Sequence, residues 1–153
     1  MFRKKTRVIS NRFRKIDSLK KFSSYIGKIV YSKSGEHIGR IYDLLFSKDT
    51  FVGVLVKGKK DVFIGKEFFR GESDKSIILK IEPITNLIGK QVFDAIGKRV
   101  GIVKDIKRKT KSNNYTDLRI KKSIYRRSFY IPKKDIEVAK KNIILKKEYN
   151  PKK

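Results

Sequence analysis

The chain has 153 residues, with 41 Lys or Arg against 15 Asp or Glu, and a formal net charge of +26. So large an excess of positive charge favours a polyanionic partner. The absence of cysteine and the single histidine exclude disulfides, thiolate chemistry and a histidine-cluster metal site. No apolar run is long enough to span a bilayer, and the first residues lack the apolar region of a secretory signal. We therefore expect a cytoplasmic protein without a membrane partner.

Positive charge is concentrated in two parts of the chain. Residues 1–24 carry 9 basic residues and 1 acidic residue, and residues 83–147 carry 19 and 5, whereas residues 25–82 are nearly balanced at 11 and 8. We interpret residues 1–24 as a basic N-terminal extension and residues 148–153 as a C-terminal tail. Basic residues that alternate with apolar ones suit contacts with nucleic acid. The candidates are Arg3, Lys4, Lys5, Arg7, Arg12, Arg14 and Lys15. The alternative is a disordered basic leader.

An internal repeat follows the extension. The segment IGKIVYSKSGEHIGRIYDLLFSK from Ile26 matches IGKQVFDAIGKRVGIVKDIKRK from Ile88 at a constant offset of 62 residues. Further along, Ile64 matches Ile131, so the offset has grown, and this predicts a longer loop in the second copy. The repeat therefore predicts two similar domains, at residues 25–82 and 83–147.

Each copy is predicted to consist of β-strands, because short runs rich in Val, Ile, Phe and Tyr alternate with turn residues. The first copy has predicted strands at residues 28–31, 38–47, 51–57, 62–64 and 76–81. The second copy has predicted strands at residues 99–109, 115–122, 126–131 and 142–147. Short strands with one apolar face are best buried in a barrel, so we predict an all-β fold of two small tandem barrels packed on each other.

The spacing of glycines is the same in the two copies. The repeated positions are Gly27, Gly35, Gly39 and Asp43 in the first copy, and Gly89, Gly97, Gly101 and Asp105 in the second. Together with Ile64-Gly65-Lys66 and Ile131-Pro132-Lys133, this pattern resembles the PRC-barrel family. That family includes the cytoplasmic barrel of the photosynthetic reaction-centre H subunit and the C-terminal domain of the bacterial ribosome maturation factor. The resemblance implies a small barrel adaptor without catalysis, and the tandem arrangement resembles archaeal members, some of which act in cell division.

One strand end differs in character between the copies. The first copy has Leu44-Leu45-Phe46 where the second has Ile106-Lys107-Arg108. We therefore predict that the first barrel contacts protein through Leu44, Leu45 and Phe46, and that the second contacts phosphates. The basic residues concerned are Lys104, Lys107, Arg108, Lys109 and Lys111. The alternative is a solvated strand end.

A further basic cluster lies next to tyrosines in the second copy. If Leu118 and Ile120 point inward, the alternation of a strand sends Tyr115, Arg119 and Lys121 outward together. An aromatic ring beside guanidinium groups suits base stacking and phosphate pairing. The basic candidates are Arg119, Lys121, Lys122, Arg126 and Arg127. We interpret Tyr125 and Tyr130 as core residues, and residues 109–114 as a flexible loop that either reaches into RNA or forms a hairpin tip.

No catalytic constellation is recognisable. We interpret Asp43 and Asp105 as structural acids because the repeat relates them, and His37 as an exposed loop residue. The run Lys57-Gly58-Lys59-Lys60 lacks the Ser or Thr of a phosphate-binding Walker loop. We expect no enzymatic activity, no cofactor, no metal and no small-molecule substrate.

The sequence favours a structural RNA-binding protein. The most specific hypothesis is a ribosomal protein that binds rRNA through its basic extension and second barrel, next to neighbouring ribosomal proteins. RNA is preferred over DNA because no helix-turn-helix, zinc-finger or homeodomain pattern is present. The alternatives are a ribosome maturation or assembly factor, a protein-interaction adaptor such as one in archaeal cell division, and a peripheral protein on anionic lipid.

Overall fold

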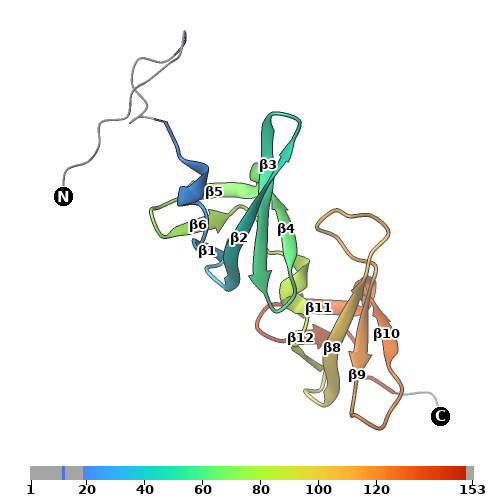
Figure 1. Ribbon diagram of the computed structural model, residues 1–153. Helices are drawn as coiled ribbons and strands as arrows, with labels where there is room; N and C mark the ends of the chain where they lie inside the picture. Colours follow the sequence, from blue (N-terminus) through green and yellow to red (C-terminus); the bar gives the residue numbers. More distant parts are fainter. Residues whose placement is uncertain (1–11, 13–18, 151–153) are drawn as a thin grey trace.

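The computed structural model describes residue 12 and residues 19–150. Within them the chain forms two six-stranded sheets that follow one another in sequence and lie end to end (Figure 1). We call the first sheet, β1–β6, barrel 1, and the second, β7–β12, barrel 2. No α-helix occurs in the described part of the chain, which has four short 3-10 helices, one before β1 and three between strands. The predicted all-β fold with two tandem barrels is confirmed.

The two barrels have the same strand order, β4-β3-β2-β1-β6-β5 and β10-β9-β8-β7-β12-β11. In each, the first strand pairs antiparallel with the second and parallel with the sixth. The strands of barrel 1 are β1 (Ile29–Tyr31), β2 (His37–Ser47), β3 (Thr50–Gly58), β4 (Val62–Gly65), β5 (Phe69–Glu72) and β6 (Ser76–Leu79). Those of barrel 2 are β7 (Gln91–Phe93), β8 (Arg99–Lys107), β9 (Asp117–Lys121), β10 (Phe129–Pro132), β11 (Ile136–Ala139) and β12 (Ile143–Leu145). The 3-10 helices are η1 (Phe22–Ser24), η2 (Lys66–Phe68), η3 (Ile84–Leu87) and η4 (Lys133–Asp135).

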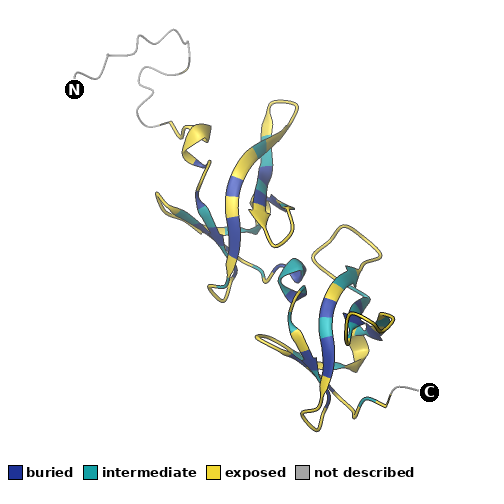
Figure 2. Cartoon of the chain, turned by 60° about the horizontal axis from the view of Figure 1, so that its bottom comes forward, coloured by how far each residue is buried: buried dark blue, intermediate teal, exposed yellow. Residues whose placement is uncertain are grey.

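Each barrel has its own core, built by the inward side of the strand alternation (Figure 2). In barrel 1 the fully buried side chains include Val30, Ile41 and Val54, and in barrel 2 they include Val103 and Leu118. The two cores are separate clusters. At about 25 cal/mol per Å² of apolar surface, such buried side chains are the main stabilising contribution within each barrel.

The repeated aspartates stand at equivalent bulges in the second strand of each barrel. The register shifts between Ile41 and Asp43 in β2, and between Val103 and Asp105 in β8. Each carboxylate then accepts a hydrogen bond from the next backbone amide, at 2.8 Å for Asp43 and 2.9 Å for Asp105. The bulge bends the strand so that the sheet can close around its core.

The N-terminal side of barrel 1 is covered by η1. The ring of Phe22 packs edge-on against Phe46, with centroids 4.9 Å apart, and lies 5.7 Å from Phe51. Tyr25, which follows η1, is buried in the core of barrel 1. Residues at the end of the predicted extension therefore pack on the first barrel.

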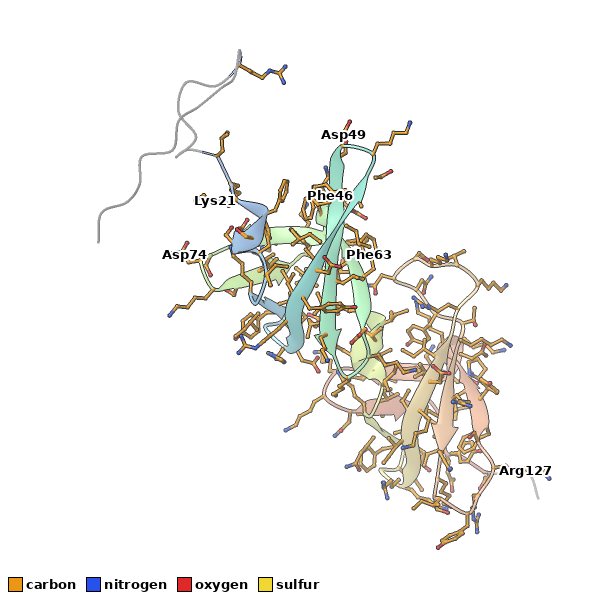
Figure 3. All side chains as sticks on the ribbon, viewed as in Figure 1. Lys21, Phe46, Asp49, Phe63, Asp74 and Arg127 are labelled. Carbon is orange, nitrogen blue, oxygen red and sulfur yellow. The ribbon has the colours of Figure 1, made fainter. Side chains whose placement is uncertain are left out.

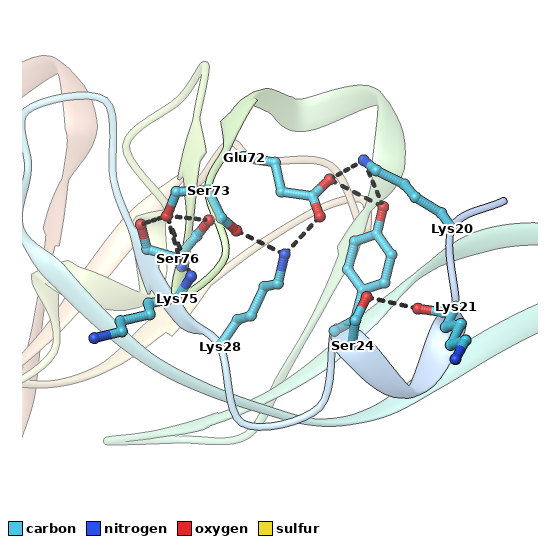
Figure 4. Close-up of polar contacts among 9 residues, drawn as sticks. Lys20, Lys21, Ser24, Lys28, Glu72, Ser73, Lys75 and Ser76 are labelled. Carbon is cyan, nitrogen blue, oxygen red and sulfur yellow. Dashed lines mark hydrogen bonds and ion pairs between the residues drawn. The ribbon is translucent and has the colours of Figure 1, made fainter. Parts of the chain in front are cut away.

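A carboxylate cluster fastens the same region (Figure 4). Lys28 donates hydrogen bonds to Glu72 at 2.6 Å and to the carbonyl oxygen of Ser73 at 2.7 Å. Lys20 also pairs with Glu72, and the Tyr25 hydroxyl donates to it at 3.1 Å. Partial burial raises the pKa of Glu72, but the three hydrogen bonds outweigh it and lower the pKa to about 2.

The barrels meet through the linker and a long loop of barrel 2. The side chain of Asn113, in the loop between β8 and β9, accepts a hydrogen bond from the Ile84 amide and donates one to the Glu82 carbonyl, both at 2.9 Å. The drift that the repeat showed is divided between two loops, because the offset grows from 62 to 64 across this loop and from 64 to 67 across the loop between β9 and β10. The loop joins the antiparallel strands β8 and β9, as a hairpin tip does, and Asn113 ties it to the linker. Its predicted contact with RNA stays a prediction.

Two ion pairs also cross between the barrels. Lys60 lies 3.3 Å from Asp105, and Lys90 lies 3.4 Å from Glu36. The barrels are therefore in contact, as the repeat predicted, but through polar groups and not through a shared core.

Candidate nucleic-acid interface

Most of the predicted contacts of the N-terminal extension lie outside the described residues. They are Arg3, Lys4, Lys5, Arg7, Arg14 and Lys15. Arg12 is described and is exposed. Their contribution to binding stays a prediction.

The second predicted cluster divides between a strand and the long loop. Lys104 and Lys107 are exposed on β8, and the Lys107 ammonium lies 5.7 Å from the centre of the Tyr130 ring. Arg108, Lys109 and Lys111 are exposed in the loop that folds back toward the linker. Arg108 and Lys111 line a small hollow there with Phe63 of barrel 1. These two basic residues therefore lie close to the junction of the barrels.

The predicted protein-contact residues lie on the β2–β3 hairpin of barrel 1, near the labelled Phe46 in Figure 3. Leu45 and Phe46 are exposed at 37% and 46%. Leu44 is different, because the bulge at Asp43 turns its side chain inward, where it packs on the core of barrel 1. Of the three predicted residues, only Leu45 and Phe46 are exposed at the surface.

The third predicted cluster begins on β9, where the expected alternation is confirmed. Leu118 and Ile120 are fully buried, and Arg119 and Lys121 lie on the outer side. Tyr115 is an exception, because it precedes β9 and packs against the core of barrel 2. Burial raises the pKa of its hydroxyl. The prediction that Tyr115 stands outward with Arg119 and Lys121 is therefore wrong.

Part of the charge on this face is neutralised within the protein. Arg119 lies opposite Asp105 on β8, with a guanidinium nitrogen 3.6 Å from the carboxylate, and opposite Tyr130 on β10. The hydrogen bond from the Ile106 amide lowers the pKa of Asp105 most, burial acts in the opposite sense, and Lys60 and Arg119 lower it further. The outer face of β9 is thus less cationic than its sequence suggests.

A group of exposed basic and apolar side chains lies at the end of barrel 2 that points away from barrel 1, where Figure 3 labels Arg127. It is built by the turn between β7 and β8 and by the loop between β9 and β10. We call it the far-end patch, and its members, all exposed, are Ile96, Lys98, Arg99, Lys122, Ile124, Tyr125, Arg126 and Arg127. Lys98, Arg99 and Lys122 line one small hollow, which shows that the turn and the loop adjoin.

The loop between β9 and β10 presents its side chains almost entirely to solvent. Tyr125 is 96% exposed and Ile124 is 82% exposed. The interpretation of Tyr125 as a core residue is therefore wrong. The predicted strand at residues 126–131 begins only at Phe129, so the residues before it, including Tyr125, belong to an exposed loop. Tyr130 is also not in the core, because Ile131 takes the inward position and leaves Tyr130 outside.

A buried carboxylate holds the adjoining turn in place. Asp94 is 1% exposed and accepts hydrogen bonds from the amides of Ile96, Lys98 and Tyr149, at 3.1, 2.8 and 3.3 Å. Burial raises its pKa, but these amide hydrogen bonds outweigh burial and lower it. The carboxylate is thus turned inward, and it leaves the positive charge of Lys98 and Arg99 on the outside.

Sequence reasoning missed Ile96, Lys98, Arg99, Ile124 and Tyr125 as members of the site. A signal for Lys98 and Arg99 was present, because the repeat places them where the first copy has Glu36 and His37. In barrel 1 that same end faces barrel 2, through the Glu36 and Lys60 ion pairs. The tandem arrangement therefore covers this end in barrel 1 and leaves it open in barrel 2.

The match to known families fits this architecture. The model of the PRC-barrel domain matches the chain twice, at residues 18–82 and 79–148. The chain belongs to the PRC-barrel family. The first PRC match includes η1 and Tyr25, which pack on barrel 1 in the structure. A search of the curated proteins found no match.

Two other features of this PRC-barrel protein concern metal binding and membrane spans. In residue 12 and residues 19–150, no group of three or more acidic or histidine side chains is placed to hold a metal ion. The same part of the chain has no helix with the length and apolar character of a membrane span.

Proposed function

We propose that this PRC-barrel protein is a structural RNA-binding protein, and most specifically a ribosomal protein seated on rRNA beside neighbouring ribosomal proteins. The observation that carries the proposal is the far-end patch of barrel 2. It joins five basic side chains to an exposed tyrosine on an end of the barrel whose buried acid, Asp94, faces inward.

The chemistry of the patch matches a folded or single-stranded RNA. Arg126 and Arg127 provide planar guanidinium groups that pair with phosphate oxygens through two hydrogen bonds each. Tyr125 between them and Ile124 offers a ring on which an unpaired base stacks, an interaction of about 1–3 kcal/mol per base. Duplex DNA offers no splayed bases, so the patch favours RNA.

Binding by such a patch is strongly dependent on salt. Each neutralised phosphate contributes about −0.7 to −0.9 to the slope of log affinity against log salt. The double variant Arg126→Gln/Arg127→Gln should therefore lower affinity for a hairpin RNA at least about tenfold and reduce the slope by about 1.5. The measurement is fluorescence anisotropy of a labelled hairpin RNA with a single-stranded loop, across a salt series, with the full chain.

A matched control removes the same charge from barrel 1. Lys66 and Lys75 are exposed and lie away from the far-end patch. Lys66→Gln/Lys75→Gln should retain most of the affinity, and Tyr125→Ala should weaken binding without changing the slope. Equal losses in the two double variants would reduce the proposal to unspecific charge attraction. Tighter binding to the matching DNA hairpin would oppose the choice of RNA.

The cellular form of this function is open to a separate test. A ribosomal protein stays with mature subunits when ribosomes are washed and sedimented, whereas a maturation factor is found only on precursor particles. We expect the former, with the protein in the cytoplasm.

A protein-adaptor function is the second candidate, and the β2–β3 hairpin of barrel 1 favours it. Leu45, Phe46 and the ring of Phe22 form an exposed apolar group there. If this group binds a neighbouring protein, Leu45→Asp should remove that contact in crosslinking experiments while affinity for RNA remains. Loss of cellular function in this variant alone would favour an adaptor over an RNA-binding protein.

A further inference from the structure

Each barrel buries one lysine immediately before its first strand. Lys28 and Lys90 are equivalent in the repeat, and their side chains are 6% and 11% exposed. Each ammonium donates a hydrogen bond to a backbone carbonyl in the turn between the last two strands, that of Ser73 in barrel 1 and that of Lys140 in barrel 2. The two lysines are therefore held in the same way by the backbone.

The carboxylates that neutralise these lysines differ. In barrel 1 the carboxylate belongs to Glu72, the last residue of β5, at 2.6 Å from Lys28. In barrel 2 the last residue of β11 is Ala139, which has no charge to offer. Lys90 instead has Glu36 of barrel 1, at 3.4 Å and with a side chain 39% exposed. Barrel 2 thus keeps the buried lysine and lacks the carboxylate of its own strand.

The position where that carboxylate would lie opens into a groove between the barrels. The groove has a volume of about 1000 Å³, and Lys90 and Ala139 both line it. Lys59, Lys140 and Lys141 add positive charge to its walls, and the apolar side chains include Pro83 and Leu87. The side-chain Nδ2 of Asn86, also in the wall, is buried without a hydrogen-bond partner in the described part of the chain.

We propose that this groove binds an acidic segment of a partner protein, with a Glu or Asp carboxylate on Lys90 in the place that Glu72 takes on Lys28. A carboxylate at the end of a flexible side chain reaches a recessed ammonium, and the apolar wall accepts the neighbouring side chains. A nucleic-acid strand fits less well, because its phosphates are part of its backbone and do not reach the Lys90 ammonium, whose side chain is only 11% exposed. Glu36 and Glu82 line the same groove and disfavour a ligand with a negative charge at every unit. The site is separate from the far-end patch and does not depend on RNA binding.

The first test uses a peptide of alternating leucine and glutamate, five residues long with blocked ends, titrated into the ¹⁵N-labelled full chain. We expect amide shift changes at Gly89, Lys90 and Ala139. The variant Lys90→Met should weaken binding at least about tenfold, since a hydrogen bond to a charged group contributes about 1.5–3 kcal/mol. Lys66→Met removes the same charge from an exposed position of barrel 1 outside the groove and should leave binding unchanged.

The second test supplies the missing carboxylate from barrel 2 itself. Ala139→Glu places a glutamate where barrel 1 has Glu72, so it should raise Tm and abolish binding of the peptide. This variant keeps the proposal testable even if Lys90→Met does not fold.

Four results would overturn the proposal. They are no shift changes in the parent chain, equal binding of a peptide with glutamine in place of glutamate, undiminished binding to Ala139→Glu, and shifts of the same groove amides by a uridine hexanucleotide. The last result would assign the groove to RNA. Because the readout is peptide binding, failure here leaves the anisotropy test of the far-end patch unaffected.

Discussion

At the scale of the residue, a few substitutions between equivalent positions separate the chemistry of the two barrels. Glu36 and His37 become Lys98 and Arg99, which turns a charged contact with the neighbouring barrel into an open basic surface. Glu72 becomes Ala139, which leaves a buried lysine without a carboxylate from its own barrel. The strand order around these positions is the same in the two barrels, so these side chains are expected to account for much of the chemical difference between them.

The Glu72 cluster gives the clearest stability prediction at this scale. The pKa of Glu72 is about 2 in the folded protein, against an ordinary value of 4.5. The contribution of its carboxylate to stability is therefore present above pH 4.5 and is lost as the pH falls toward 2. Glu72→Gln should lower the free energy of unfolding by about 1–2 kcal/mol at pH 6, a range that allows for solvent screening of the partly exposed pair. The difference between the parent and the variant should disappear by about pH 2. Urea unfolding at several pH values measures it.

A matched substitution separates this effect from the loss of any surface acid. Glu67 is exposed in η2 of the same barrel, so Glu67→Gln should change stability little at any of these pH values. If Glu72→Gln were as mild as Glu67→Gln at pH 6, the cluster would have no stabilising role.

At the scale of the element, the second strand of each barrel approaches the third so closely at one glycine that no side chain fits at that position. A Cβ atom on Gly39 in β2 would overlap the Lys57 carbonyl oxygen of β3, and one on Gly101 in β8 would lie 2.7 Å from the Lys121 carbonyl oxygen of β9. Both obstacles are backbone atoms, which move only if the strands separate. This explains why the glycines recur at the same place in the two copies.

We therefore predict that Gly39→Ala destabilises barrel 1 by more than about 2 kcal/mol, the range expected for overpacking. Gly71 in β5 is the control, because a Cβ atom there meets nothing within 4 Å. Gly71→Ala should change stability by less than about 1 kcal/mol. Thermal unfolding followed by NMR signals of barrel 1 makes the comparison, and equal melting of the two variants would refute the explanation.

How far the sequence predicts these elements depends on whether a strand buries a regular row of side chains. Strand β9 alternates apolar and polar residues, and β3 and β8 are rich in apolar residues, so these strands were predictable. Strand β5, with the sequence FRGE, is mostly exposed, so the sequence carried no apolar pattern to reveal it. The placement of Tyr115 failed for a related reason, because it lies outside β9, whose alternation was used to place it, and Tyr125 lies in the exposed loop before β10.

At the scale of the whole molecule, the tandem order makes the two ends of the pair unequal. One end of barrel 1 contacts barrel 2, whereas the equivalent end of barrel 2 is exposed. This exposed end carries the far-end patch. The repeat predicts two barrels, but it does not predict which end of one faces the other. That relation depends on single side chains of the long loop, such as Asn113, which have no equivalent in the first copy.

The orientation of the barrels is expected to depend on Asn113 in particular. Its two hydrogen bonds to the backbone of Glu82 and Ile84 tie the long loop to the linker, and each neutral hydrogen bond contributes about 1 kcal/mol. Because the ion pairs between the barrels, within residues 19–150, are those at 3.3 and 3.4 Å, Asn113→Ala should let the barrels reorient without unfolding either one. Residual dipolar couplings should then require a separate alignment tensor for each barrel, where the parent chain needs one.

Asn114 provides the control from the same loop. Its side chain accepts hydrogen bonds from the Tyr115 amide and from Lys133, both within barrel 2. Asn114→Ala should therefore leave a single tensor for the whole molecule, even if it loosens the loop. A single tensor in Asn113→Ala would show that the ion pairs alone fix the barrels, and salt should then release them, since exposed ion pairs weaken as ionic strength rises. The two variants together thus decide whether the groove between the barrels is held open by the loop or by charge.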